Sequence, residues 1–255
     1  MTHKQYIYDV PNGKTVVLFI HGIIGTPNHF KSFVDILPDD YAVYNLLLDG
    51  HGKTVKDFAR SSMTKWKEQV NSTVKQLAER YENIIIVAHS MGTLLAINCG
   101  IEFSKKVKLL FLLNVPLKAT LKLSTAVNSA KLALGLEKDN DMAIQNQKNA
   151  CSIQLDKKLW QYAGWIPRYL ELFKEIRATK KKISHIQNPC YAFHSKYDEL
   201  VSKKSIKYLK VNKNINVKVL EGSGHFAYSN EDSHYMLEQF KSLIMCYAEK
   251  ENISK

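Results

Sequence analysis

The sequence predicts an α/β fold in which helices flank a mostly parallel central sheet. Two observations support this prediction. Short apolar runs recur along the chain, and they are continuous rather than alternating, as expected for strands covered on both faces. Segments with helical spacing lie between these runs. Strands that alternate with helices imply a mostly parallel sheet joined by right-handed crossovers.

Six apolar runs are predicted to be strands, and each is short enough to cross one sheet. They are "TVVLFIHG" (15–22), "YAVYNLLL" (41–48), "NIIIVAHS" (83–90), "VKLLFLLNV" (107–115), "CYAFHS" (190–195) and "VKVLEG" (217–222).

Two segments between these runs are predicted to be helices. "TKWKEQVNSTVKQLAERY" (64–81) places five apolar side chains on one stripe, and "GTLLAINCGIEF" (92–103) begins where a strand has just ended. The stripe consists of Trp66, Val70, Val74, Leu77 and Tyr81.

The segment 117–187 contains no convincing strand, only helical stretches such as 123–136 and 165–182. It is too long for a plain crossover, so we expect a helical cap that stands over one end of the sheet. The predicted domains are therefore an α/β core (1–116 and 188–255) and an inserted helical cap (117–187). The cap holds 13 Lys and Arg against 6 Asp and Glu, which is +7 of the total +12. This charge indicates either a solvated basic face or a surface that binds polyanions.

Composition limits the class of protein. The chain has 255 residues, 45% of them apolar, which is enough for one sizeable core. The four cysteines show no metal-ligand spacing, and the N-terminus has no apolar signal region, so we expect a cytoplasmic protein without a metal site. No apolar stretch reaches the 18 or so residues of a membrane span. The basic charge is spread without an arginine-rich recognition stretch, so nucleic acid is not an expected partner.

Glycines mark one rim of the predicted sheet. Of the 11 glycines, 7 fall in four short stretches that follow predicted strands. The stretches are "HGIIGT", "DGHG", "HSMG" and "GSGH". Because loops at the carboxyl ends of strands build the ligand crevice in open α/β sheets, polar residues on this rim are the candidates for chemistry.

Ser90 is the candidate nucleophile. It lies in "AHSMG" between the predicted strand "IIIV" and the predicted helix "TLLAINCG", with the small residues Ala88 and Gly92 two positions before and after it. A tight strand-to-helix turn exposes the serine hydroxyl, and small flanking residues keep the turn free of clashes. The alternative is a serine that only caps the following helix.

His225 is the candidate base, since "VKVLEGSGHF" places it on a loop directly after the last predicted strand. Of the other histidines, His194 falls in or at the end of a strand and His234 falls in a helical segment. His21 and His51 accompany glycines and are expected to hold loops together.

Asp198 is the candidate acid that orients the imidazole, because "CYAFHSKYDELVS" places it just past a strand. Its rivals Asp139 and Asp141 lie inside the predicted cap, and the adjacent Glu199 is expected to point elsewhere. An oxyanion hole needs two backbone N–H groups. The residue after the nucleophile, Met91, supplies one, and Ile23 in "FIHGIIGT" is the natural source of the second.

The motifs "HGIIGT", "DGHG", "AHSMG", "KYDELV" and "GSGHF" occur in an order that resembles the α/β-hydrolase superfamily over nearly the whole chain. Within it, the chain resembles bacterial carboxylesterases and monoacylglycerol lipases. The resemblance implies an α/β-hydrolase fold with a helical cap inserted after the sixth strand, and a Ser90–Asp198–His225 triad with oxyanion amides at Ile23 and Met91. Two departures are Ala88 in place of glycine and Asp49-Gly50 where an arginine- or lysine-glycine pair is common.

We therefore expect a serine hydrolase that cleaves carboxylic esters through an acyl-enzyme and needs no cofactor or metal. Thioester, amide or carbon–carbon bond hydrolysis could run on the same residues, and a non-catalytic ligand-binding homologue is a further alternative. The basic charge of the cap also suggests that the protein contacts a lipid interface. The oligomeric state is not predicted.

Overall fold

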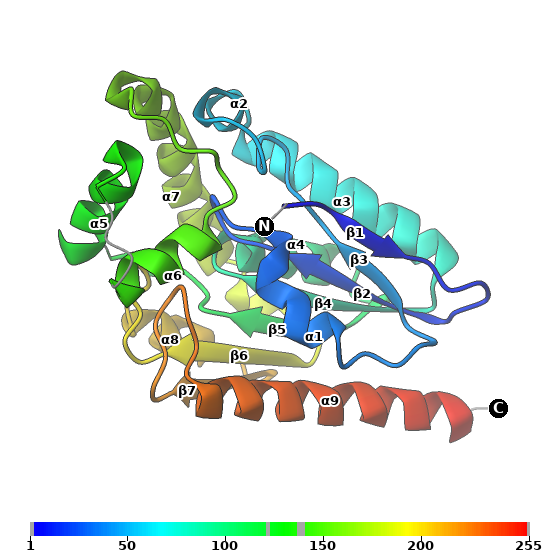
Figure 1. The fold of residues 1–255 in the computed structure, drawn as a ribbon. Helices are drawn as coiled ribbons and strands as arrows, with labels where there is room; N and C mark the ends of the chain where they lie inside the picture. The colour runs from blue at the N-terminus through cyan, green and yellow to red at the C-terminus, as the bar shows by residue number, and fades with distance from the viewer. Residues whose placement is uncertain (1–2, 121–122, 137–140, 254–255) are drawn as a thin grey trace.

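The computed structural model describes residues 3–120, 123–136 and 141–253. The strands among these residues form one seven-stranded sheet (Figure 1). The strand order is β1-β3-β2-β4-β5-β6-β7, with β1 antiparallel to β3 and all other neighbours parallel. The strands are β1 (Tyr6–Tyr8), β2 (Thr15–Ile20), β3 (Ala42–Asn45), β4 (Asn83–His89), β5 (Val107–Leu113), β6 (Cys190–Ser195) and β7 (Ile215–Leu220).

All six predicted strands are present, which confirms the α/β class. Apart from shifts of one or two residues at the ends of other strands, two details differ from the prediction. The three residues of β1 were missed because they are exposed and a run of three apolar residues is too short to indicate a strand. β3 ends at Asn45 rather than residue 48, since the chain then turns into the loop at Gly50, while Leu46 and Leu48 still pack into the core.

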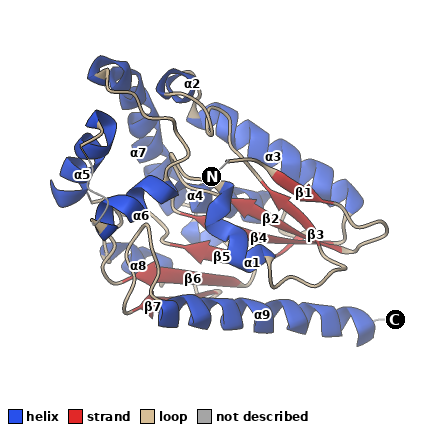
Figure 2. Cartoon of the chain, in the orientation of Figure 1, coloured by secondary structure: helices blue, strands red, loops and turns tan. Residues whose placement is uncertain are grey.

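Helices cover both faces of the sheet (Figure 2). Alternate strand residues divide between two apolar clusters, as the two-residue period of a strand requires. On one face lie α3 (Met63–Arg80), α4 (Met91–Glu102) and α8 (Lys204–Leu209); on the other lie η1 (Pro27–Phe30), α1 (Lys31–Val34) and α9 (Asn230–Ile253). The short α2 (Val55–Ala59) precedes α3. All five residues of the predicted apolar stripe on α3 and at its end are buried.

The segment between β5 and β6, called the insertion below, contains helices. Its described part contains α5 (Leu123–Leu134), α6 (Met142–Ala150), η2 (Leu159–Trp165), α7 (Ile166–Lys180) and η3 (Ile183–His185). The position implied for the insertion, after the sixth strand, is wrong. It follows β5, the fifth strand along the described chain, because β1 alone precedes β2.

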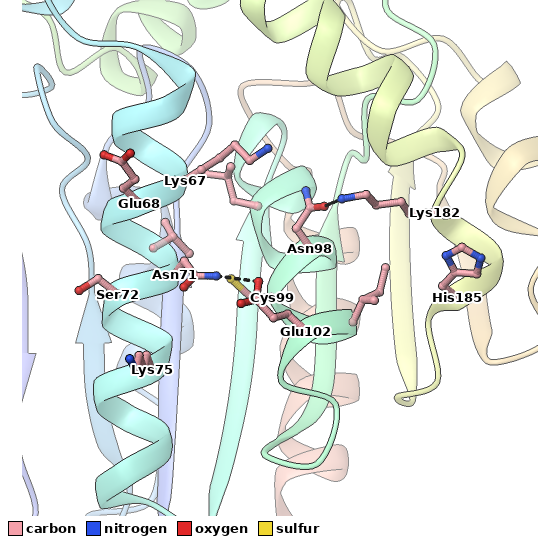
Figure 3. Close-up of a pocket in the computed structure, with 13 residues that line it drawn as sticks. Lys67, Glu68, Asn71, Ser72, Lys75, Asn98, Cys99, Glu102, Lys182 and His185 are labelled. Atoms are coloured by element: carbon pink, nitrogen blue, oxygen red, sulfur yellow. Dashed lines mark hydrogen bonds between the residues drawn. The ribbon is translucent and has the colours of Figure 1, made fainter.

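Polar contacts tie α7 to the helices of the core. The carboxylate of Glu175, on the buried face of α7, accepts hydrogen bonds from Lys67 on α3 and Asn98 on α4. Beyond α7, Lys182 donates to Asn98 at 2.6 Å (Figure 3). Lys67, Asn98 and Lys182 border a groove of about 820 Å³ between α3 and α4, which shares no lining residue with the pocket at Ser90. Within the described residues, no helix is both long and apolar enough to cross a membrane.

Candidate active site

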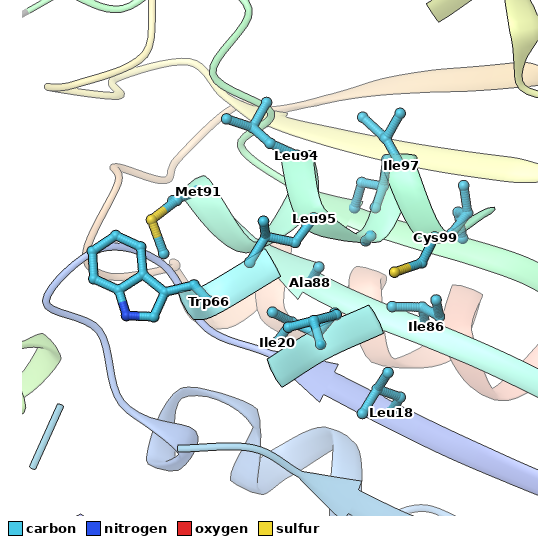
Figure 4. Packing of buried hydrophobic residues seen from close by; sticks show 14 of the residues in the cluster. Leu18, Ile20, Trp66, Ile86, Ala88, Met91, Leu94, Leu95, Ile97 and Cys99 are labelled. Atoms are coloured by element: carbon cyan, nitrogen blue, oxygen red, sulfur yellow. The ribbon is translucent and has the colours of Figure 1, made fainter. Parts of the chain in front are cut away.

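Ser90 occupies a strained turn between β4 and α4. Its φ of 51° and ψ of −124° lie outside the regions that a side chain favours. The turn is held by buried packing on both sides: Ala88 lies within β4, and Met91 and Leu94 of α4 face the apolar cluster (Figure 4). Such strain persists only where the surroundings fix it, and it is concentrated at functional sites.

Two glycines let the backbone close around this turn. A side chain at Gly92 would collide with the carbonyl oxygens of Ile20 and His21, so only glycine fits the start of α4 against β2. A side chain at Gly22 would approach the Cβ of Ser90 to 2.9 Å. The loop after β2 and the turn after β4 are therefore in direct contact.

The alternative role for Ser90, as a helix cap, is not supported. Ser90 precedes the first residue of α4, but its side chain makes no capping hydrogen bond to the helix. Instead, the backbone carbonyl of Ser90 accepts hydrogen bonds from Thr93, one from its hydroxyl at 2.6 Å and one from its N–H at 2.9 Å. The Ser90 hydroxyl is thus not engaged in holding the helix end.

His225 and Asp198, which follow β7 and β6, lie together. The Nδ1 atom of His225 is 2.9 Å from Oδ2 of Asp198 and 3.1 Å from its Oδ1, and both side chains are buried. Burial opposes ionisation of Asp198. The charge of His225 and hydrogen bonds from its ring and from the N–H groups of Val201 and Leu200 outweigh this, and they hold the pKa of Asp198 below its usual value.

Glu199 was expected to point elsewhere, and among the described residues it forms no hydrogen bond with the ring of His225, which contacts Asp198. However, its carboxylate accepts a 2.7 Å hydrogen bond from the backbone N–H of His225. Sequence reasoning missed this contact, because adjacency to Asp198 gives no sign of which main-chain group the second carboxylate meets. Of the rival acids, Asp139 lies outside the described residues, and Asp141 caps α6 by accepting from the N–H of Ile144.

Ser90 and His225 line the same pocket, which has a volume of about 360 Å³. These two described residues form no hydrogen bond with each other in the structure. Contacts of this kind are often long in ligand-free sites and tighten when substrate binds. Most of the rest of the wall comes from the segment after β2 and from helices of the insertion, and His89, Leu200 and Phe226 complete it. The wall residues include Ile23, Ile24, Gly25, Thr26 and His29 from the segment after β2, and Ser129, Gln147, Ala150 and Tyr169 from the insertion.

The two expected oxyanion residues differ in how they relate to this pocket. Ile23 lines it, on the loop that Gly22 brings against Ser90. Met91 is the first residue of α4 and its side chain is fully buried in the core, so only its backbone N–H can serve the pocket (Figure 4). A helix N-terminus favours negative charge at this point.

Two further histidine rings lie near the candidate base. The ring of His89 lies 4.8 Å from that of His225 and stacks on His29 at 4.1 Å between ring centres. Burial lowers the pKa of His29 to about 4, with a smaller contribution from His225, and burial places the pKa of His89 well below its usual value. Both rings are therefore neutral at neutral pH.

The histidines expected to hold loops do so. The N–H of Leu48 donates to Nε2 of His21, and the Nδ1 atom of His51 contacts the carbonyl of Leu48. Asp49 stands where an arginine or lysine is common in similar sequences. Its carboxylate accepts a hydrogen bond from the hydroxyl of Ser61. Within the described ranges, no group of three or more His, Cys, Asp or Glu is arranged to hold a metal ion.

Comparison with known proteins gives the class. Residues 11–232 match the model of a protein family described as serine aminopeptidase, S33. Together with the sheet topology, this match defines the protein as a serine hydrolase of the α/β-hydrolase class. The chain belongs to the serine aminopeptidase S33 family.

Two curated relatives are similar over part of the chain. A probable lysophospholipase of Arabidopsis thaliana, BODYGUARD 4, is 32% identical over 120 residues, which is 45% of this chain and 28% of the plant protein. A thermostable monoacylglycerol lipase of Bacillus sp. (strain H-257) is 30% identical over 82 residues, which is 32% of this chain and 33% of the lipase. The matched stretch thus spans about a third or less of either relative.

The fold also resembles solved structures over its full extent. The structure reported for LipS and LipT, two metagenome-derived lipolytic enzymes, aligns with a TM-score of 0.70 at 17% identity. The alignment covers 96% of this chain and 98% of that one. At this identity the likeness establishes the fold.

Proposed function

We propose that the protein hydrolyses carboxylic esters with Ser90 as nucleophile, His225 as general base and Asp198 as the residue that orients the imidazole. One observation carries the proposal. A serine on a strained turn and a histidine held by a buried carboxylate face the same pocket. The alternative of a non-catalytic homologue would predict that one of these groups is missing or turned away.

In the acylation step, the hydroxyl oxygen of Ser90 attacks the ester carbonyl while its proton passes to Nε2 of His225. Asp198 stabilises the resulting imidazolium through Nδ1. The negative charge on the carbonyl oxygen is received by the backbone N–H groups of Ile23 and Met91. Collapse of this intermediate breaks the bond to the alcohol, which leaves with the proton from His225.

In the deacylation step, water replaces the alcohol. His225 takes a proton from the water as it attacks the acyl-enzyme, and the same two amides receive the oxyanion. His225 then returns the proton to the Ser90 oxygen, and the carboxylic acid is released. The chain's own residues supply every group that these steps require.

The acyl group has a suitable apolar space next to the pocket at Ser90. A second hollow of about 270 Å³ adjoins the pocket, and the two share Ile24, Ser129, Gln147 and Tyr169. Its other walls are mostly apolar: Leu132, Ala133, Cys151, Leu155, Leu159, Tyr162 and Trp165. Because residues of 117–187 form most of these walls, we propose that this segment is a cap that selects the acyl chain.

Ester substrates fit the pocket better than peptides with a free amino terminus. An aminopeptidase needs a carboxylate to bind the charged α-amino group. The pocket wall within the described residues contains no Asp or Glu, and Asp198 behind it is engaged by His225.

A reducing cytoplasm is part of the proposal, because Cys99, Cys151, Cys190 and Cys246 are all free.

The test is hydrolysis of p-nitrophenyl acyl esters by purified protein. Ser90→Ala should abolish turnover and prevent labelling by a fluorophosphonate probe, while the control Ser72→Ala, at an exposed serine on α3, should behave as wild type. Thioester and amide analogues in the same assay measure which bond is preferred. Undiminished ester hydrolysis by folded Ser90→Ala protein would exclude the proposed mechanism.

A further inference from the structure

The outer face of α7 carries an exposed apolar stripe. Ile166, Leu170 and Phe173 are 60%, 62% and 43% exposed. Their spacing of four and three residues places them on one side of the helix. Large apolar side chains at consecutive turns of a helix are usually covered, so this stripe has the character of a contact surface.

The stripe is not needed to attach α7 to the protein. An adjoining side of the same helix, which faces the protein, supplies Leu172 and Ile176 to the core and Tyr169 to the wall of the pocket. The salt bridge from Lys67 to Glu175, at 3.0 Å, fastens this inner side. The inner side of α7 therefore packs against the protein, and the apolar stripe on its outer side does not contribute to this packing.

The turn η2, which leads into α7, adds a second exposed apolar group. Trp160 is 73% exposed and Leu159 is 50% exposed, whereas the nearby Trp165 is buried against Phe58. A tryptophan with its ring exposed suits a boundary between water and lipid, where its apolar body and polar N–H are both accommodated.

Cationic side chains flank these apolar groups. Lys157 and Lys158 precede the exposed tryptophan, and Lys174 and Arg177 follow Phe173 along α7, all of them exposed. Within the part of the chain that the structure describes, none of the four forms an ion pair. Their charge is therefore available to an anionic partner.

We propose that this surface, made of Leu159, Trp160, Ile166, Leu170, Phe173 and the flanking cations, docks on an anionic phospholipid surface. An apolar stripe bordered by Lys and Arg is the pattern by which a helix lies in the plane of a bilayer interface. The cations meet lipid phosphates, and the apolar side chains enter the boundary with the acyl chains. The proposal does not depend on the chemistry at Ser90.

A second copy of the chain is a poorer occupant of this surface. In a two-fold contact through the stripe, the cations that flank it on one copy would lie near the cations of the other, and like charges oppose such pairing. A single helical stripe with one short turn is also smaller than a stable dimer interface requires.

The same helix, α7, would contact the lipid surface and form part of the pocket wall. Tyr169, in the pocket wall, is adjacent in sequence to Leu170, in the stripe. A membrane-bound α7 would thus hold a wall of the pocket close to the lipid surface.

The experiment is co-sedimentation of the full chain with vesicles, measured without substrate. We expect binding to vesicles of equal parts phosphatidylglycerol and phosphatidylcholine, and little to phosphatidylcholine alone. The triple variant Ile166→Ser/Leu170→Ser/Phe173→Ser should bind about tenfold more weakly, and Lys174→Glu/Arg177→Glu should lose the preference for the anionic vesicles. All five positions are exposed, so these variants should fold.

The matched control is Val211→Ser/Met245→Ser, which removes two exposed apolar side chains outside the insertion and should bind as wild type. Equal binding by the triple variant, or no binding by wild type, would overturn the proposal. A dimer that dissociates in the triple variant would also overturn it, in favour of a second copy. Ester hydrolysis by the variants is measured separately, so failure of docking and failure of the proposed reaction are distinguishable.

Discussion

Glu199 accepts a 2.7 Å hydrogen bond from the backbone N–H of His225, while its neighbour Asp198 binds the ring of the same histidine. Two consecutive carboxylates after β6 therefore hold one residue at two points. A side chain at Gly224 would come within 2.8 Å of the Glu199 carboxylate, which shows how closely the loop is drawn onto it. This relationship makes Glu199 a positioning residue for the proposed base.

Glu199→Ala is expected to lower kcat for ester hydrolysis about tenfold, since a hydrogen bond to a charged acceptor contributes about 1.5–3 kcal/mol. KM should change little, because Glu199 does not line the pocket. Glu199→Gln keeps an acceptor and should restore most of the activity. Steady-state kinetics of the two variants test this, and a Gln variant as impaired as the Ala variant would argue against a positioning role.

Asp198→Asn is expected to reduce kcat by about a thousandfold or more, because the imidazole loses the charge that stabilises its protonated form. If Ser90, His225 and Asp198 act as one unit, the double variant Ser90→Ala/Asp198→Asn should be no slower than Ser90→Ala alone. Single-turnover rates of the three variants measure this. Losses that multiply in the double variant would show that the residues act independently.

The strands and the Ser90 turn could be predicted from sequence because buried parallel strands require continuous apolar runs such as Ile84–Val87. The short edge strand β1 could not, since a run of three exposed apolar residues is too short to indicate a strand. The contact of Glu199 with the backbone N–H of His225 could not be predicted either, because it depends on the packing of the loop after β6 against the loop after β7. The arrangement of helices in the insertion also follows from contacts distant in sequence, such as Gln147 donating to Ser129.

Ser90→Gly is expected to stabilise the fold while it removes the proposed nucleophile. A non-glycine residue at φ 51° and ψ −124° stores about 1–3 kcal/mol of backbone strain, and glycine relieves it. We expect the free energy of unfolding to rise by about 1 kcal/mol in urea titrations. Ser90→Ala keeps a side chain and should not gain this stability, so it serves as the control. Equal stability of the Gly and Ala variants would mean that the turn is unstrained.

Acid should destabilise the protein through its buried histidines, and His51 is the clearest case. Burial lowers its pKa to about 4, against about 6.5 in the unfolded chain. Between these values the unfolded chain binds more protons, so the free energy of unfolding falls as the pH falls from about 6.5 to about 4. Above this window both states are neutral, and below it both are protonated. This residue alone accounts for a loss of about 3 kcal/mol.

The measurement is the free energy of unfolding in urea as a function of pH. His51→Asn keeps a donor for the Leu48 carbonyl but cannot titrate, so its stability should vary less over the window, even if it is lower at neutral pH. The exposed His234→Asn should follow the wild-type curve. A His51→Asn curve parallel to that of the wild type would contradict the assignment.

The hollow that adjoins the Ser90 pocket should set the preferred acyl chain length. Ala133, on α5, is buried and lines that hollow together with Leu132 and Leu155. Ala133→Phe fills part of its volume of about 270 Å³, so activity on medium acyl chains should fall about tenfold or more, while acetyl and butyryl esters are cleaved as before. The control Ala178→Phe adds the same ring on the exposed side of α7 and should change neither the activity on medium acyl chains nor that on short ones.

The ratio of kcat/KM for long and short p-nitrophenyl esters is the measurement. A uniform loss on all chain lengths would place the acyl group elsewhere, because a ring that blocks only the far end of the hollow cannot hinder an acetyl group at Ser90.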